Sequence, residues 1–138
     1  MQEKRDFYIN GEWVKSQGGT DHNVIDPSTE EPTAVITLGS EADTNAAVAA
    51  AKAALPAWMA TPVEERIAYV SKLVEIYDAR AEELAAAMSA EMGAPISLSR
   101  TSQVGAGSYH LKNFINAAKG FEFNRPLGAH APNDRIIY

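Results

Sequence analysis

The ability of a chain to hold a metal ion or to carry out thiol chemistry depends first on its histidines and cysteines. The three histidines here, His22, His110 and His130, lie far apart, and none belongs to an H-E-x-x-H segment or a similar ligand spacing. The sequence contains no cysteine, which excludes disulfides, thiolate metal sites and thiol catalysis by these residues. We therefore interpret the histidines as structural or solvated residues and not as a metal triad.

Two other patterns suggest chemistry at first sight. Gly105 and Gly107 begin like a dinucleotide-binding fingerprint, but the third glycine is missing and a helix stop precedes them, so close helix packing is the better interpretation. Glu64-Glu65 and Glu82-Glu83 are pairs of adjacent carboxylates. Adjacent residues on a helix do not face each other, and we interpret both pairs as solvated. The residues alone predict no catalytic site.

Strands and helices must position any functional residue. The first of these elements along the chain are predicted to be β-strands. Segments 7–9 and 12–14 flank an Asn-Gly dipeptide, which accepts the positive φ of a type I′ hairpin turn. Segments 23–25 and 34–38 flank a stretch dense in turn residues at 26–32. The sequence therefore predicts two β-hairpins within residues 7–38.

Helical patterns occupy residues from about 41 to 119. Ser40 and Asp43 form a capping-box pattern before an alanine-rich helix, which Pro56 should end or kink. Thr61 and Pro62 signal the start of a second helix, with the threonine hydroxyl as its N-cap.

The second helix has an apolar face. Along it, apolar residues recur at alternating steps of four and three, which places them together: Val63, Ile67, Val70, Val74, Tyr77, Ala81, Leu84 and Met88. Gly93 and Pro95 supply its stop. The spacing predicts one long helix from residue 63 to this stop.

A third helix is expected from about Ser97 to Lys119, with Gly120 as its cap. Its expected inner residues are Leu111, Phe114, Ile115 and Ala118. The aromatic residues expected to fill the core or an interface are Trp13, Trp58, Tyr77 and Phe114. Two short strands are expected in the tail, at 121–123 and 135–138. The fold class predicted is α+β, with N-terminal hairpins, three amphipathic helices and a C-terminal hairpin.

Composition narrows the class of protein further. The chain has 138 residues, 46% of them hydrophobic and 22% charged, which is typical of one globular domain. Its net charge of −6 argues against nucleic-acid binding and against an anionic membrane surface. The longest apolar run, 53–60, is far shorter than the ~18 residues needed to span a bilayer. No signal peptide is visible, so we expect a cytoplasmic location.

Several short motifs, in their order and spacing, resemble the start of an aldehyde dehydrogenase. They are Tyr8-Ile-Asn-Gly-Glu-Trp13, Ile25-Asp-Pro27, Ala42-Asp43 opening an alanine-rich helix, Trp58, Pro62, Arg66, Glu83-Leu-Ala85 and Glu91-Met-Gly-Ala-Pro95. Each motif is weak alone, and together they extend the resemblance from about Phe7 to Tyr138. The resemblance implies part of an α/β enzyme that oxidises an aldehyde to a carboxylic acid with NAD or NADP.

In that family a cysteine thiolate attacks the carbonyl, hydride leaves to the nicotinamide, and a glutamate activates the hydrolytic water. The matching cysteine, glutamate and nucleotide-binding units lie downstream of the region matched here. The resemblance therefore carries over no catalytic and no cofactor-binding residue, and the chain alone is expected to be inactive. Residues 1–120 would belong to the cofactor-binding domain. Residues 121–138 would start the β-segment through which subunits form a homo-oligomer.

One site could lie within the matched region. Some relatives bind a monovalent cation between main-chain carbonyls before the Asn/Asp-Pro turn and an acid just before the Gly-x-Pro helix stop. The matching positions here are Val24, Ile25 and Glu91. Alkali cations prefer hard oxygen ligands, and a helix end leaves free carbonyls nearby. The alternative is that Glu91 is a surface acid near a helix end.

The sequence leaves two interpretations of the whole chain open. In the first, the chain is the N-terminal part of an aldehyde dehydrogenase and depends on the rest of that polypeptide and on other subunits. In the second, it is a stand-alone interaction module that pairs with a full-length subunit. The apolar Ile-Ile-Tyr ending favours the first reading, because a stand-alone domain is expected to protect such an edge.

Overall fold

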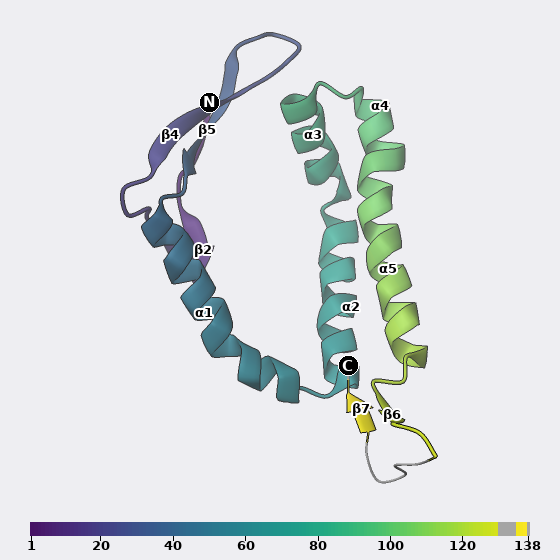
Figure 1. The fold of residues 1–138 in the computed structure, drawn as a ribbon. Coiled ribbons are helices and arrows are strands. Elements are labelled where there is room, and N and C mark those ends of the chain that lie inside the picture. Colours follow the sequence, from purple (N-terminus) through teal and green to yellow (C-terminus); the bar gives the residue numbers. More distant parts are fainter. Residues whose placement is uncertain (130–134, 138) are drawn as a thin grey trace.

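The computed structural model describes residues 1–129 and 135–137, which form two arms joined at one end (Figure 1). One arm holds the N-terminal strands and the first helix, and the other holds the remaining helices side by side. The order of strands and helices gives the predicted α+β class.

The N-terminal arm contains two separate β-sheets. Strands β2 (Phe7–Ile9) and β3 (Glu12–Val14) pair antiparallel, and strands β4 (Thr20–Ile25) and β5 (Pro32–Leu38) do the same. Both predicted hairpins are confirmed. Positive φ angles of 54° at Asn10 and 84° at Gly11 fit the predicted turn.

No local pattern predicts a further strand at the N-terminus. Strand β1 (Gln2–Lys4) pairs parallel with β5, which gives a sheet in the order β1-β5-β4. All three of its residues are exposed, so no alternation of apolar and polar side chains marks it.

Helix α1 (Glu41–Ala60) begins with the predicted capping box of Ser40 and Asp43. Of the two effects predicted for Pro56, an end of the helix is wrong, because α1 continues through it to Ala60, and a kink stays a prediction. Proline removes the N–H that would bond the carbonyl of Lys52. Residues 51–60 are all exposed, so water can satisfy that carbonyl.

Two helices replace the single long helix predicted after residue 62. Helix α2 (Val63–Ala79) and helix α3 (Ala81–Met92) are separated at Arg80, whose φ of −106° and ψ of 16° leave the helical region. The Arg80 N–H is shared between the carbonyls of Ile76 and Tyr77, both at 3.1 Å, as is common at helix ends. The predicted apolar face is confirmed, since all eight of its residues are buried or half-buried.

The predicted cap at the start of α2 is wrong, whereas the predicted stop at the end of α3 is confirmed. Thr61 does not cap α2; its hydroxyl donates to the carbonyl of Ala57 at 3.0 Å and closes the end of α1. Gly93 does end α3 in the left-handed conformation, with a φ of 68°, as predicted.

The last predicted helix is helical throughout but is not a uniform α-helix. Helix α4 (Ile96–Leu98) leads into a π-helical turn, η1 (Ser99–Gln103), and then into α5 (Val104–Gly120). In this turn the fully buried Ser99 donates to Oε1 of Gln103 at 2.9 Å. Gly120 is the last residue of the helix and not its cap; the chain turns extended at Phe121.

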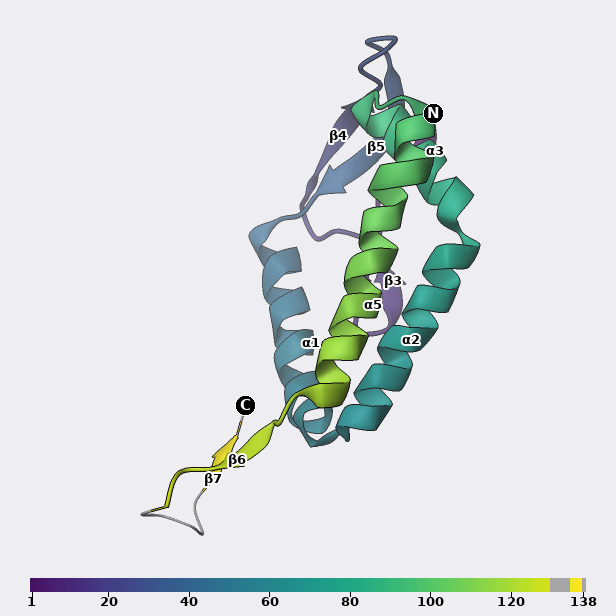
Figure 2. The same ribbon diagram turned by 90° about the vertical axis from the view of Figure 1, so that its right-hand side faces the viewer.

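The tail forms a hairpin that projects away from the helices (Figure 2). Strands β6 (Asn124–Pro126) and β7 (Arg135–Ile137) pair antiparallel. The first tail strand was predicted at 121–123, and this prediction is wrong, because the strand begins only at Asn124. The rings of Phe121 and Phe123 lie just before it and pack against each other 4.8 Å apart. His130 and Tyr138 lie outside the described residues.

The small core is divided between the arms, with Val35 in β5 of the N-terminal arm and the other buried apolar residues on α2, α3 and α5. Its buried apolar residues are Val35, Val74, Ala85 and Val104. Trp13 and Phe114 do not fill this core, since they are 72% and 70% exposed, and Trp58 is also exposed. Tyr77 is half-buried and its hydroxyl donates to the Val104 carbonyl at 3.0 Å. None of the helices among the described residues has the length and hydropathy needed to cross a bilayer.

Candidate functional site

Asp43 organises the junction between α1 and the N-terminal strands. Its carboxylate accepts hydrogen bonds from the Ser16 hydroxyl at 2.5 Å, the Gln17 N–H at 2.8 Å and the Ser40 N–H at 2.9 Å. Ser16 and Gln17 belong to the segment between β3 and β4, far from α1 in the sequence. The buried carboxylate therefore ties the start of α1 to that segment.

These donors also change the acidity of Asp43. The hydrogen bond from the Ser16 hydroxyl, followed by those from the N–H groups of Gln17 and Ser40, lowers the pKa of Asp43 from 3.8 to about 2. Donors that stabilise the charged form have this effect. The sequence identified this residue only as part of a capping box, and no local pattern reveals that residues 16 and 17 fold back onto it.

The residues predicted to hold a cation lie on two neighbouring segments. Val24 and Ile25 end β4, and Glu91 lies exposed in the last turn of α3. A Cβ placed on Gly93 would come within 2.7 Å of Cγ of Pro27. This close approach brings the end of α3 against the loop that follows β4 (Figure 1).

The loop after β4 is held by its own hydrogen bonds. Asp26 accepts from the N–H and the hydroxyl of Ser28 at 2.8 and 2.6 Å. These bonds lower the pKa of Asp26. Its main-chain N–H donates to the Glu31 carbonyl at 3.0 Å. Pro32, the strand partner of Ile25, has no N–H to offer the Ile25 carbonyl.

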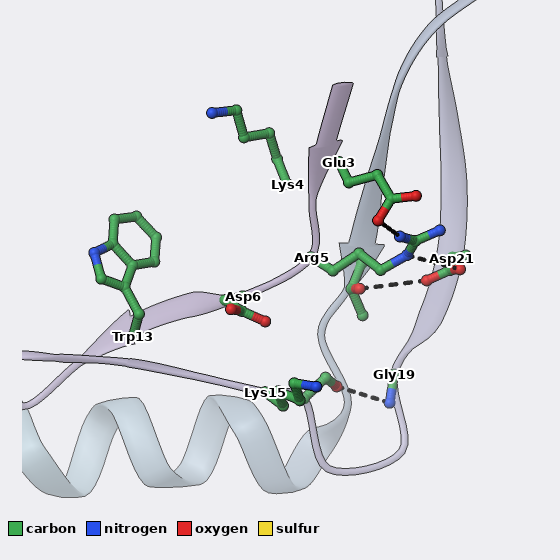
Figure 3. Close-up of a pocket in the computed structure, with 10 residues that line it drawn as sticks. Glu3, Lys4, Arg5, Asp6, Trp13, Lys15, Gly19 and Asp21 are labelled. Carbon is green, nitrogen blue, oxygen red and sulfur yellow. Dashed lines mark hydrogen bonds and ion pairs between the residues drawn. The ribbon is translucent and has the colours of Figure 1, made fainter. Parts of the chain in front are cut away.

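An open hollow of about 700 Å³ lies between β1, β3 and β4 (Figure 3). Arg5 pairs there with Glu3 at 2.6 Å and with Asp21 at 3.1 Å, and the Asp21 hydrogen bond raises the pKa of Arg5. Lys4 and Lys15 also line the hollow. The ion pairs satisfy the carboxylates of Glu3 and Asp21, so the hollow holds no free acid–base pair of these residues.

Within the part of the chain that the structure describes, no three His, Cys, Asp or Glu side chains converge as metal ligands. His22 lies in β4 and His110 in α5, on different arms of the molecule. Close helix packing was predicted for Gly105 and Gly107, and it is found at only one of these two positions. Gly107 lies against the Tyr77 ring, while a Cβ on Gly105 would meet nothing within 4 Å.

Comparison with known proteins adds what the geometry alone does not show. The sequence profile of the aldehyde dehydrogenase family matches residues 13–134. The 3-succinoylsemialdehyde-pyridine dehydrogenase of a Pseudomonas species is 33% identical over 129 residues, which are 93% of this chain and 27% of that protein. The chain thus spans about a quarter of the length of this relative.

Solved structures give the same result. The crystal structure of an aldehyde dehydrogenase from Bartonella henselae superposes with a TM-score of 0.90 at 46% identity, covering 94% of this chain and 27% of that one. An aldehyde dehydrogenase from Pseudomonas syringae, solved with NAD+ and octanal, gives a TM-score of 0.87 at 37% identity, covering 90% of this chain and 26% of that one. The chain described here belongs to the aldehyde dehydrogenase family.

Proposed function

We propose that this chain is the N-terminal scaffold of an enzyme that oxidises an aldehyde to a carboxylic acid with NAD or NADP. The TM-score of 0.90 over 94% of the chain against the Bartonella henselae enzyme carries this proposal. Relatives solved with NAD+ support the choice of cofactor class. The proposal includes the cytoplasmic location expected from the sequence.

The residues present in this chain indicate which part of the enzyme it supplies. The chain contains no cysteine and so cannot supply the thiolate that the family uses as its nucleophile. Its own residues hold the strands, α1 and the paired helices in place. We assign residues 1–120 to the cofactor-binding domain and residues 121–138 to the β-segment that joins subunits of a homo-oligomer. The projecting β6–β7 hairpin supports the second assignment, because exposed strand edges pair readily with other chains.

A chimeric enzyme tests the proposed function. Residues 13–134 of this chain replace the matched segment of the Bartonella henselae enzyme, and aldehyde-dependent reduction of NAD+ is followed. The chimera is expected to keep activity within about tenfold of its parent, since a change of ~1.4 kcal/mol corresponds to that factor. The chain alone is expected to show none.

Two controls make the chimera informative. The Bartonella henselae enzyme without the matched segment is expected to be inactive, because the scaffold is missing. Size-exclusion chromatography and NAD+ binding show whether the chimera has folded and assembled. A chimera that folds and binds NAD+ but does not oxidise aldehydes would count against the proposal.

We propose further that Val24, Ile25 and Glu91 help to hold a monovalent cation. The contact between Gly93 and Pro27 supports this, because it brings the end of α3 to the loop after β4. Pro32, the strand partner of Ile25, has no N–H to donate to the Ile25 carbonyl, which is a hard oxygen ligand. Main-chain carbonyls and one carboxylate are a suitable donor set for Na+ or K+.

Thermal melts in different salts test the cation site. At equal ionic strength the Tm is expected to be higher in sodium or potassium chloride than in choline chloride, because a bound ion stabilises the folded state. Glu91→Gln is expected to abolish the difference, whereas Glu64→Gln, an exposed acid on α2, is expected to leave it unchanged. Identical melts of the unmodified chain in all three salts would retire this site.

A further inference from the structure

The turn between β2 and β3 carries the only Asn-Gly dipeptide of the chain. Asn10 and Gly11 are both exposed, with φ angles of 54° and 84°. A Cβ on Gly11 would meet nothing within 4 Å. An open hollow of about 390 Å³ lies between this turn and alanine side chains of α1, beside which β2 runs (Figure 1). Water therefore reaches the dipeptide, and no neighbouring side chain blocks the nitrogen of Gly11.

Two groups of this turn that can react with each other are free of hydrogen bonds. The pairing of Ile9 with Glu12 closes the turn and leaves the Gly11 N–H outside the ladder. Within the described residues neither this N–H nor the Asn10 carboxamide has a hydrogen-bond partner. The hairpin is a separate two-stranded sheet of three residue pairs. Because such a sheet is only marginally stable, the turn can open and let the two groups approach.

The other asparagines of the described residues lack this combination. Each lies within a strand or a helix, and each is followed by a residue with a side chain: Asn23, Asn45, Asn113, Asn116 and Asn124. In α1 and α5 the next N–H is bonded to the carbonyl four residues earlier. A Cβ on the next residue also crowds the main chain, whereas glycine leaves it free to rotate.

We propose that Asn10 is a site of spontaneous deamidation. The main-chain nitrogen of Gly11 loses its proton and attacks Cγ of Asn10, so that a new N–Cγ bond forms. The bond between Cγ and Nδ2 breaks, and ammonia leaves. Water then opens the cyclic imide at Cγ, which gives an aspartyl linkage, or at the main-chain carbonyl, which gives an isoaspartyl linkage. The reaction consumes only water, and the inference does not depend on the enzymatic proposal.

The isoaspartyl product is expected to disturb the hairpin. Its main chain runs through Cβ of residue 10 and is one atom longer, and the pairing of a two-residue hairpin depends on the length of its turn. The rings of Tyr8 and Trp13 pack across the hairpin, 5.3 Å apart. Loss of register would separate them, which makes tryptophan fluorescence a readout of the conversion.

Mass spectrometry of protease digests tests the inference. The 138-residue chain is incubated in neutral and in mildly alkaline buffer, together with a Bartonella henselae chimera extended to residues 1–134. Conversion of the amide to the acid is expected at Asn10 at least tenfold faster than at the other asparagines of the described residues, which corresponds to a barrier lower by about 1.4 kcal/mol. Alkali is expected to speed it, because the attacking nitrogen must lose a proton. Chromatography is expected to separate aspartyl and isoaspartyl peptides.

Asn10→Gly is the matched control, because Gly-Gly is another dipeptide that suits a type I′ turn and has no carboxamide. This variant is expected to keep its tryptophan fluorescence during an incubation that changes the fluorescence of the unmodified chain. Circular dichroism checks that it is folded. Conversion at Asn10 no faster than at Asn23 would overturn the inference. Conversion in the 138-residue chain but not in the chimera would also overturn it, by showing that the rest of the enzyme shields the turn.

Discussion

A Gly107→Ala variant is expected to unfold with a free energy about 1–2 kcal/mol lower than that of the unmodified chain. The added methyl group would lie 2.7 Å from Cζ of Tyr77 and still closer to its hydroxyl. The ring must then move, and the hydroxyl loses its 3.0 Å bond to the Val104 carbonyl. Such overpacking costs about 1–3 kcal/mol, while alanine gains up to ~1 kcal/mol of helix propensity over glycine.

Gly105→Ala is the control for this prediction. It lies two residues earlier in α5, is exposed, and a Cβ there would meet nothing within 4 Å. Only the gain in helix propensity remains, so this variant is expected to be more stable by about 0.5–1 kcal/mol. Urea denaturation followed by circular dichroism measures both. Equal stability changes in the two variants would show that α2 and α5 do not pack through Gly107.

Loss of the Asp43 carboxylate is expected to lower the Tm by several degrees at neutral pH and to reduce its dependence on acid. The folded-state pKa of about 2 lies below the ordinary value of 3.8. The ionised carboxylate therefore stabilises the fold fully above about pH 4, and this contribution is lost as the pH falls toward about 2. The Tm of the unmodified chain is expected to fall steeply in that window.

Asp43→Asn keeps the shape of the side chain but replaces one acceptor oxygen with an N–H₂ donor. The variant can therefore keep the bond from Gln17 to Oδ1 or the bonds from Ser16 and Ser40 to Oδ2, but not both sets. Asp26→Asn is the matched control. The pKa of Asp26 is also lowered, but its hydrogen bonds stay within its own loop, so a smaller loss is expected. Thermal melts from pH 2 to 7 compare the two. If Asp43→Asn melts with the same pH slope as the unmodified chain, the junction at Asp43 does not hold α1 in place.

Local sequence patterns correctly predicted the turns and caps that depend on interactions between neighbouring residues. The Asn-Gly turn, the capping box and the left-handed Gly93 each depend on a few neighbouring residues, and all three are confirmed. The apolar face of α2 and α3 also follows from spacing alone, because the period of a helix fixes which side chains share a face.

Some of the wrong predictions involve a competing local interaction, and others depend on residues far apart in the sequence. Pro56 does not end α1, since its helix is exposed there and water can satisfy the freed carbonyl. Thr61 binds back to Ala57 instead of capping α2. The exposure of Phe114 and the parallel strand β1 have no local signal, because each depends on what the other elements cover.

The candidate sites, too, could be predicted from the sequence only in part. The sequence placed Val24, Ile25 and Glu91 on segments that the Gly93–Pro27 contact brings together. It did not reveal that Asp43 joins two elements or that Arg66 lines an apolar groove with no acidic partner among the described residues. Those features arise from tertiary packing, which the spacing of residues along the chain does not encode.

We propose that this chain works as the scaffold of an aldehyde-oxidising enzyme whose catalytic residues lie elsewhere in the polypeptide. An antibody against residues 1–129 can isolate the gene product from the source cell for intact mass and activity measurements. We expect a polypeptide several times heavier than 14.9 kDa that reduces NAD+ or NADP+ when an aldehyde is added. A product of 14.9 kDa with no associated aldehyde oxidation would show that the chain is not part of such an enzyme.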